Sequence, residues 1–247
     1  RLPSKVFVDP HQGLRDLLLS TLRTPSPPEV SFSDDPLRMM RAARFASQLG
    51  FELDPDAFAA MADMAERIEI ISSERVRDEL IKLLLANDPK PGLQMLVDSG
   101  IAELVLPELP ALRLEIDEHH HHKDVYQHSL TVVDQTIALE KSYGLENDLV
   151  LRLAALLHDI GKPATRRLEA GGAVTFHHHD MVGAKLAKKR LTALRFDNDT
   201  IKAVARLVEL HLRFFGYSDQ QWSDSAVRRY VRDAEDQLNR LHILTRA

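Results

Sequence analysis

Apolar side chains recur every three to four positions along most of this 247-residue chain. In the segment DVYQHSLTVVDQTIALEKSYG, for example, Val125, Leu130, Val133 and Ile137 follow that spacing. This is the period of an amphipathic α-helix, whereas the strict alternation that indicates a strand is rare. Glycine and proline are also sparse, with 10 and 12 residues. We therefore predict an all-α fold.

Composition narrows the class of protein further. No apolar run approaches the roughly 20 residues that cross a bilayer, and no secretory segment opens the chain, so we predict no membrane partner and a cytoplasmic location. Because cysteine is absent, only His, Asp and Glu are expected to hold a metal. The net charge of -5 gives no overall attraction to nucleic acid. RNA contact would need a local basic cluster, such as AKLAKKRLTALR at residues 184–195.

The chain divides into three expected parts. Val6 to Val8 indicate a lone strand, which is unstable by itself and which we interpret as the remnant of an α/β head lying upstream. We expect the end of this head and a proline-broken linker (TPSPPEVS, 24–31) in residues 1–31, a helical neck and body in 32–116, and a second helical domain in 117–247. In the body we predict helices at 35–49, 55–66, 74–86 and 92–99, with turns at LANDPKPG and SGIAELVLPELP.

A second feature is the segment LRLAALLHDIGK, residues 151–162. It predicts an apolar helix that carries His158 and Asp159 at its end and breaks at Gly161. Imidazole and carboxylate both bind first-row metals, but neighbouring helical residues point about 100° apart, so another helix must complete such a site. Any single histidine on a helix is more often a packed core residue, and that alternative stays open. Three further histidines stand at helical positions elsewhere: His128, His179 and His211.

The segment DDPLRMMRAARFASQLGF indicates a nucleotide-reading helix. Asp35 and Arg38 are three residues apart at its start, so their side chains share a face. A carboxylate accepts the amino group of cytosine or adenine and a guanidinium donates to the adjacent ring acceptors, so this pair could select C and A without a template. Arg41 and Arg44 continue the face and could hold phosphates. The alternative is an ordinary surface ion pair worth a few tenths of a kcal/mol.

The ordered pattern H…HDxGK…H…H, preceded by DVYQHSL, resembles the HD superfamily of metal-dependent phosphohydrolases. The resemblance implies that His128, His158 and Asp159 bind a divalent transition metal such as Mn²⁺, Ni²⁺ or Co²⁺. It also implies that Lys162 lies near phosphate. His179 and His211 would extend the site to a second metal or to substrate phosphate. The bound metal would activate water for hydrolysis of a phosphomonoester or a 2′,3′-cyclic phosphate.

The family pattern needs one more aspartate late in the domain. The chain ends at HILTRA without it. We favour truncation of the domain over replacement by Asp233 or Asp236. The run His119–His122 precedes His128, and because it lies mid-chain we interpret it as a native linker at the entrance of the domain rather than as a tag.

Ahead of this unit stand, in order, the segments VDPHQGLRDL, DDPLRMMRAARFASQLGF and SSERVRDEL. This ordered set resembles the bacterial class II tRNA nucleotidyltransferases and the related poly(A) polymerases. VDPHQGLRDL matches the hinge-like motif DxxxGxxD. DDPLR matches the base-reading motif EDxxR, with Asp34 in place of the usual Glu. SSERVRDEL matches ERxxxE, which braces the neck helices in that family. The matching residues are Asp9, Gly13 and Asp16 in the first motif, Asp35 and Arg38 in the second, and Glu74, Arg75 and Glu79 in the third.

This second resemblance implies addition of CTP and ATP to the tRNA 3′ end, with Asp35, Arg38 and Arg41 binding the nucleotide. The Mg²⁺-binding carboxylates of the family belong to the upstream head, so we expect no polymerisation from this chain alone. The expected partners are the tRNA 3′ end, CTP, ATP and a second copy of the chain. Two alternatives remain: a poly(A) polymerase, and an RNA-binding scaffold with a degenerate HD unit, which would rest on residues 184–195 and on the missing aspartate.

Overall fold

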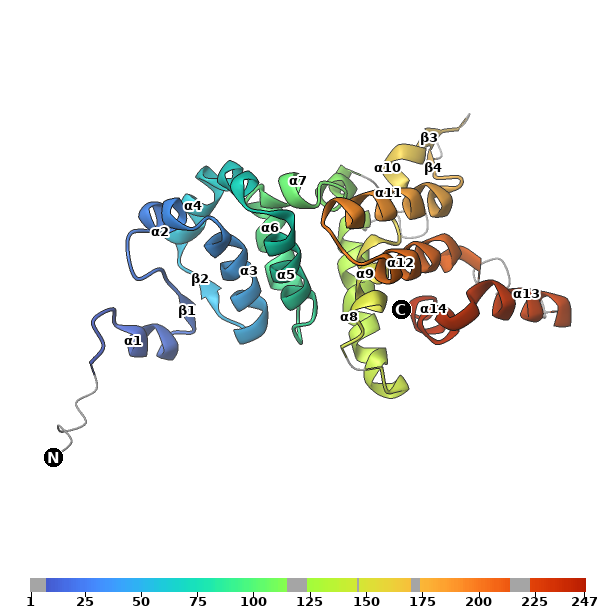
Figure 1. The fold of residues 1–247 in the computed structure, drawn as a ribbon, viewed down its shortest axis with the longest axis horizontal. Coiled ribbons are helices and arrows are strands. Elements are labelled where there is room, and N and C mark those ends of the chain that lie inside the picture. The colour runs from blue at the N-terminus through green and yellow to red at the C-terminus, as the bar shows by residue number, and fades with distance from the viewer. Residues whose placement is uncertain (1–7, 115–123, 146, 170–173, 214–222) are drawn as a thin grey trace.

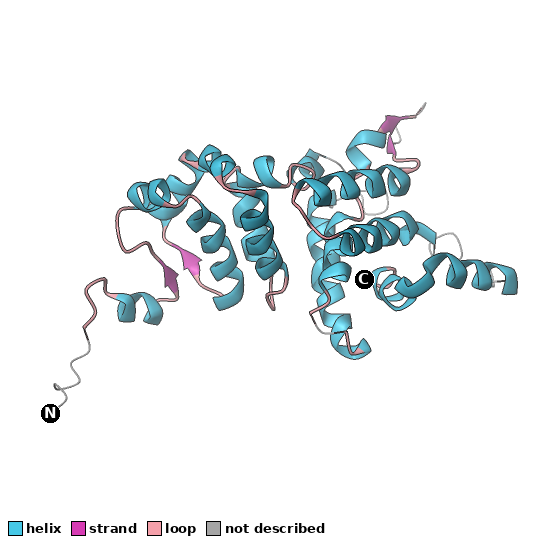
Figure 2. Cartoon of the chain, viewed as in Figure 1, coloured by secondary structure: helices cyan, strands magenta, loops and turns pink. Residues whose placement is uncertain are grey.

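The computed structural model describes residues 8–114, 124–145, 147–169, 174–213 and 223–247. Helices dominate this part of the chain, which confirms the predicted fold class (Figure 2). The first half contains α1 (Gly13–Leu18), α2 (Pro28–Asp34), α3 (Leu37–Leu49), α4 (Pro55–Asp63), η1 (Ala65–Ile70), α5 (Ser73–Leu84), α6 (Lys90–Asp98), α7 (Ile101–Val105) and η2 (Pro110–Leu114). The second contains α8 (Val125–Tyr143), α9 (Leu149–Leu157), α10 (Lys162–Thr165), α11 (His179–Ala193), α12 (Asn198–Leu210), η3 (His211–Arg213), α13 (Asp224–Ala234), η5 (Glu235–Gln237) and α14 (Leu238–Leu244).

Two short sheets accompany the helices. β1 (Thr21–Leu22) pairs in parallel with β2 (Glu52–Leu53), and β3 (Arg167–Leu168) pairs antiparallel with β4 (Val174–Thr175). Helices α2 to α7 occupy one half of the molecule and α8 to α14 the other, with α5 of the first half packed against α9 of the second (Figure 1). None of the described helices is both long and apolar enough to span a lipid bilayer.

The four helices predicted in the body are found as α3, α4, α5 and α6, with ends that agree with the prediction or differ by up to three residues. The prediction of a linker at 24–31 was wrong for its last part, because α2 begins at Pro28 and buries Ser31 and Phe32. A proline fits the first turn of a helix, where its missing N–H needs no partner. The predicted strand Val6–Val8 lies outside the described residues except for exposed Val8, and His119–His122 lie outside them entirely.

The segment SGIAELVLPELP was also predicted as a turn, and it contains α7 and the start of η2. Gly100 precedes α7 with a φ of 81°, a left-handed conformation that glycine adopts without strain. Helix α7 then buries Ile101, Ala102 and Val105. With five residues it is too short for a hydrophobic period to be read from the sequence.

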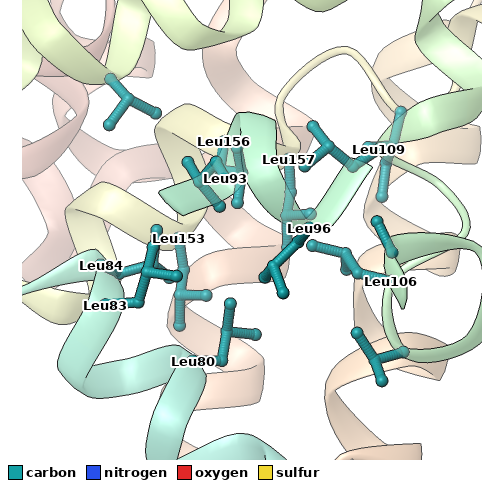
Figure 3. Close-up of a cluster of buried hydrophobic side chains, with 14 of the residues drawn as sticks. Leu80, Leu83, Leu84, Leu93, Leu96, Leu106, Leu109, Leu153, Leu156 and Leu157 are labelled. Carbon is teal, nitrogen blue, oxygen red and sulfur yellow. The ribbon is translucent and has the colours of Figure 1, made fainter. Parts of the chain in front are cut away.

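One continuous hydrophobic core joins the two halves of the molecule. Figure 3 shows leucines of α5 and α6 in the same cluster as leucines of α9. The labelled residues are Leu80, Leu83 and Leu84 from α5, Leu93 and Leu96 from α6, Leu106, Leu109, and Leu153, Leu156 and Leu157 from α9. The packing of α9 therefore fixes its last turn, which leads into His158 and Asp159, relative to the body helices.

A buried arginine of the second half, paired with a glutamate of the same half, also donates across this boundary. Arg152 of α9 and Glu140 of α8 are 3% and 1% exposed. The Arg152 guanidinium donates to both Glu140 carboxylate oxygens at 2.8–3.1 Å. Its Nη1 donates to the carbonyl oxygens of Leu84 and Ala86, each at 2.8 Å, at the end of α5. Carbonyls at a helix end lack intrahelical donors, so Arg152 satisfies groups that would otherwise be buried without a partner.

Candidate functional site

Four histidines and one lysine converge on the Asp159 carboxylate. His158 Nε2 lies 3.1 Å and Lys162 Nζ 3.0 Å from Oδ2, with His128 Nε2 at 3.8 Å. On the other side, His179 Nε2 lies 3.2 Å and His211 Nε2 3.9 Å from Oδ1. The five residues come from α8, the turn after α9, α10, α11 and η3. The structure thus brings together all the residues that the HD pattern singled out.

The main chain fixes the orientation of three of these imidazoles. His158, His179 and His211 each hydrogen-bond through Nδ1 to the carbonyl three residues earlier, at 2.8, 2.9 and 2.6 Å. A carbonyl can only accept, so each Nδ1 donates and a neutral ring keeps its lone pair on Nε2. The Nε2 atoms face Asp159. Such a backbone bond to the distal nitrogen is the usual support for a metal-binding histidine.

Several buried polar atoms around Asp159 lack a hydrogen-bond partner in the described part of the chain, as expected of atoms that bind a cation. Asp159 Oδ2, His179 Nε2 and His211 Nε2 are buried and have no hydrogen-bond partner of acceptable geometry among the described residues. Buried polar atoms without partners are costly and call for an explanation. The donors form two overlapping groups, His128 with His158 and Asp159, and Asp159 with His179 and His211, each with donor atoms within 4.8 Å of one another. Nitrogen and carboxylate donors suit a divalent transition metal.

Protonation states in the cluster are consistent with metal binding. Burial, together with the neighbouring His158, lowers the pKa of His211 to about 3, so this ring is neutral at pH 7. Burial alone would raise the pKa of Asp159, but His158, His179 and Lys162 outweigh it and hold this pKa well below its usual value. Burial opposes and the Asp159 carboxylate favours protonation of His158, and the net effect raises the pKa of His158. A metal ion binds only the deprotonated ring, so metal and proton would compete for His158 Nε2.

Two glycines allow α11 to approach the cluster. A Cβ at Gly161 would lie 2.1 Å from the His179 carbonyl oxygen and 2.6 Å from the Gly183 nitrogen. Gly161 itself has a right-handed conformation, with a φ of -79°. Its role is therefore to allow close approach of the backbone of α11. Gly183 was missed, although an isolated glycine in a helical pattern is a signal of such contact.

Substituting Gly161 by alanine should therefore displace α11 and with it His179. We expect a loss of about 1–3 kcal/mol of stability, typical of overpacking, together with weaker metal binding. Thermal unfolding with and without Mn²⁺ measures both effects. The matched control is Gly13→Ala, where a Cβ would meet Asp9 Oδ1 at an ordinary 3.5 Å. Equal unfolding temperatures and equal stabilisation by Mn²⁺ in the Gly161 variant and wild type would contradict the packing argument.

The two candidate substitutes for the missing aspartate lie apart from the cluster. Asp233 is paired with Arg213 at 3.6 Å and with Arg232 at 3.4 Å. Asp236 is exposed to solvent. Neither belongs to the two donor groups around Asp159.

The Asp35–Arg38 contact expected from sequence is replaced by other pairings. Arg38 Nη1 donates to the carbonyl and the hydroxyl of buried Ser31, at 3.1 and 2.8 Å. The Asp35 carboxylate lies 3.6 Å from Arg41 Nη1 and 3.5 Å from Arg75 Nη2. Asp35 is thus flanked by two guanidiniums from different helices, and Arg38 is held by α2. Ser31 was missed because its segment was interpreted as linker.

The third motif connects α3 and α5. Glu79 is buried and accepts from Arg44 Nε at 2.6 Å and from Lys82 Nζ at 3.1 Å. Arg44, which we predicted to be a phosphate ligand, is therefore occupied by this ion pair. Glu74 is exposed in the first turn of α5. These contacts are compatible with the predicted bracing role of the motif.

The first motif organises α1. The Asp9 carboxylate accepts from the backbone N–H groups of Gly13 and Leu14 at 2.7 and 3.0 Å, and these bonds lower the pKa of Asp9. Asp16 lies 3.3 Å from Arg23 Nε, and Arg23 also pairs with Asp54 at 2.9 Å. The motif residues therefore have local structural partners.

Two family matches cover most of this architecture. Residues 50–112 match the family described as "Probable RNA and SrmB- binding site of polymerase A". Residues 125–247 match the HD domain. The first match covers α4 to α7 with η1, and the second contains the whole histidine–aspartate cluster.

Curated relatives resemble the chain over most of its length. It is 37% identical to an A-adding tRNA nucleotidyltransferase of Deinococcus radiodurans, over 91% of this chain and 51% of that protein. It is 35% identical to a CC-adding tRNA nucleotidyltransferase of Thermus thermophilus, over 81% of this chain and 46% of that protein. A multifunctional CCA protein of Pseudomonas fluorescens is 34% identical over 76% of this chain and 45% of that protein. The chain spans about half the length of these relatives.

Solved structures share the fold. A CCA-adding enzyme in complex with CTP superimposes with a TM-score of 0.63 at 16% identity, over 96% of this chain and 49% of that chain. A tRNA-processing enzyme complex gives a TM-score of 0.62 at 18% identity, over 97% and 57%. At these identities the likeness concerns the arrangement of helices alone.

Proposed function

Because the chain belongs to the family of bacterial class II tRNA nucleotidyltransferases and related poly(A) polymerases, we propose that it forms the nucleotide-selecting and RNA-binding part of such an enzyme. In this proposal Asp35, Arg38 and Arg41 bind CTP or ATP during addition to a tRNA 3′ end in the cytoplasm, and Mg²⁺ serves the transfer reaction in the catalytic head of the family. The second function that we propose is metal-dependent phosphate hydrolysis by the HD domain.

Related enzymes of this family differ in which nucleotides they add to the tRNA. The relatives include an A-adding and a CC-adding enzyme, so addition of adenosine alone is the second candidate. A product assay distinguishes CCA addition, A addition and poly(A) addition. The full-length enzyme is incubated with tRNA ending before CCA or after CC, with CTP and ATP supplied singly and together. Complete CCA ends on the shortest tRNA support our first proposal. Extension only of tRNA ending in CC supports A-addition, and a long adenosine tail supports a poly(A) polymerase.

Substitution of Arg38 tests protein-templated selection. Arg38 is held by Ser31 beside Asp35, so removing its guanidinium should remove the donor to the base without unfolding α3. In the full-length enzyme, Arg38→Ala should reduce discrimination of CTP or ATP against GTP and UTP by roughly 5- to 150-fold, the equivalent of about 1–3 kcal/mol per base contact. Competition between nucleotides on one tRNA measures this ratio. The control is Arg240→Ala in α14, and selectivity equal to wild type in the Arg38 variant would contradict the assignment.

The observation that carries the phosphohydrolase proposal is the convergence of four imidazoles and Lys162 on one buried carboxylate. His128, His158 and Asp159 would hold the first divalent ion, and His179 and His211 would extend the site with Asp159. When bound, such an ion lowers the pKa of a water ligand to about 7 and polarises a phosphoryl oxygen.

The chain's own residues would prepare that site. The backbone carbonyls orient the Nε2 lone pairs, and burial keeps His211 neutral at pH 7. Lys162 Nζ, which lies 3.0 Å from Asp159, brings a positive charge to the place where substrate phosphate would bind.

Hydrolysis of small phosphoesters tests this proposal directly: a cyclic nucleotide would open to a nucleoside monophosphate, and a 2′- or 3′-nucleotide would release phosphate. The metal-free chain is supplied with Mn²⁺, Ni²⁺ or Co²⁺ and a 2′,3′-cyclic nucleotide or a 2′- or 3′-nucleotide. We expect products to form with at least one of these ions and formation to stop on addition of a chelator. If none of the three ions supported hydrolysis, the alternative of an RNA-binding scaffold with a degenerate HD unit would be favoured.

A further inference from the structure

Helix α11 extends from the histidine–aspartate cluster to the body. Its first residue, His179, faces Asp159. Near its other end, Arg190 donates from Nε to both oxygens of Glu108 at 3.0 and 2.8 Å. Just beyond the helix, the Arg195 carbonyl accepts from Arg77 of α5, two residues from Arg75, which pairs with Asp35. Fifteen residues span about 22 Å, so α11 reaches from one candidate site toward the other (Figure 1).

The solvent face of α11 is strongly basic. His179, Gly183, Ala187 and Leu191 are buried and define the inner side. Lys185, Lys188 and Lys189 are exposed on the opposite side, and within the described part of the chain none of them forms an ion pair. No acidic residue occurs between 181 and 196. A chain with a net charge of -5 therefore presents a concentrated patch of positive charge here, which we call the α11 lysine face, defined by these three lysines.

We propose that the α11 lysine face binds the phosphate backbone of an RNA stem, so that the RNA footprint extends from the body onto the HD domain. The assignment of RNA as the anion rests on the proposed function. The surface lies outside residues 50–112, the segment that matches the RNA-binding family. A stem whose end lies at Asp35 and Arg38 would run along α11 toward the histidine–aspartate cluster.

The chemistry of the face favours a duplex backbone over a single strand. Lysine ammonium groups are point charges that neutralise phosphates without reading bases. Proteins that bind single strands add aromatic side chains on which bases stack. From 181 to 195 the chain contains no aromatic residue, and Phe196 is buried. The face is therefore suited to a sequence-independent, salt-sensitive contact.

The experiment compares two triple variants of the 247-residue chain. Lys185, Lys188 and Lys189 are replaced together by Gln in one and by Arg in the other, which retains the charge. The probe is an RNA hairpin with a single-stranded CC 3′ end. Its binding is titrated at salt concentrations from about 50 to about 200 mM, a range over which phosphate contacts change the affinity strongly. We expect Lys→Gln to weaken binding about tenfold or more and to reduce the log–log salt slope by roughly 2–3, and Lys→Arg to bind like wild type.

Equal affinity and salt slope in wild type and the Lys→Gln variant would overturn the proposal. So would equal losses in the Lys→Gln and Lys→Arg variants, because the effect would then be structural rather than electrostatic. Tighter binding of a single strand than of the hairpin would overturn the duplex assignment. Hydrolysis of a cyclic mononucleotide is measured on the same variants and should be unchanged. Loss of hairpin binding with intact hydrolysis separates this inference from the HD proposal, and absence of hydrolysis in wild type counts against the HD proposal alone.

Discussion

Replacing Asp159 by asparagine should reduce metal-dependent hydrolysis of a 2′,3′-cyclic nucleotide at least about 100-fold. Asp159 is shared by both groups of potential ligands, and the change removes the negative charge that compensates a bound cation at a buried position. Loss of supporting residues around a metal costs about 10- to 100-fold in affinity or activity, so loss of the shared ligand should cost at least the upper value. Initial rates of hydrolysis of a 2′,3′-cyclic nucleotide at saturating Mn²⁺ measure the effect.

His128→Ala and Asp236→Ala complete this experiment. The His128 side chain is 30% exposed, so its removal leaves little cavity, and it should also reduce activity if the ring binds the metal. Asp236 is exposed and belongs to neither donor group, so its replacement should leave activity unchanged. Full activity in both the Asp159 and the His128 variants would show that hydrolysis takes place outside the histidine–aspartate cluster.

Replacing Arg152 by methionine should destabilise the folded chain by roughly 3–5 kcal/mol. The change leaves the Glu140 carboxylate buried and uncompensated, and it removes the donor to the Leu84 and Ala86 carbonyls. Removal of one partner of a buried ion pair has an effect of this size. Urea unfolding followed by circular dichroism gives the free energy of unfolding.

Two further variants test whether the loss of stability comes from the buried charge of Glu140. The double variant Arg152→Met with Glu140→Leu should recover part of the loss, because no charge is left buried. Lys90→Met breaks the exposed pair between Lys90 and Asp134, whose side chains are 36% and 42% accessible, and should cost less than about 1 kcal/mol. If Arg152→Met and Lys90→Met proved equally mild, the buried pair would have no special role in joining α9 to α5.

The hydrophobic period was sufficient to predict the long helices but not the short ones. Helices α3 and α5 show two or more turns of apolar spacing, and their positions were predicted closely. Helices α2 and α7 have seven and five residues, too few for a period to emerge, and the prolines before and at the start of α2 resembled a linker. Tertiary burial of Phe32 and Ile101 stabilises both helices, and sequence alone does not show that burial.

At the candidate sites, the sequence was a good guide to which residues lie close together. It was a poorer guide to which of those residues form ion pairs or hydrogen bonds with each other. The histidine–aspartate cluster contains His128, His158, Asp159, His179 and His211 as expected, because those histidines stand in a specific order around HDxGK. The partners of Asp35 depend on α5, which is distant in sequence, so Arg75 and Arg41 replaced Arg38 as its neighbours. Arg152 gave no signal, since an arginine in an apolar helix does not reveal a buried partner on another helix.

Metal titration tests the central claim most directly. The chain is stripped with a chelator, dialysed, and titrated with Mn²⁺ in a calorimeter, in parallel with its Asp159→Asn and Asp236→Ala variants. We predict saturable binding by the wild type and by the Asp236 variant, and loss of that binding in the Asp159 variant. Absence of binding in the wild type, or equal binding by the wild type and the Asp159 variant, would contradict the assignment of this cluster as a metal centre.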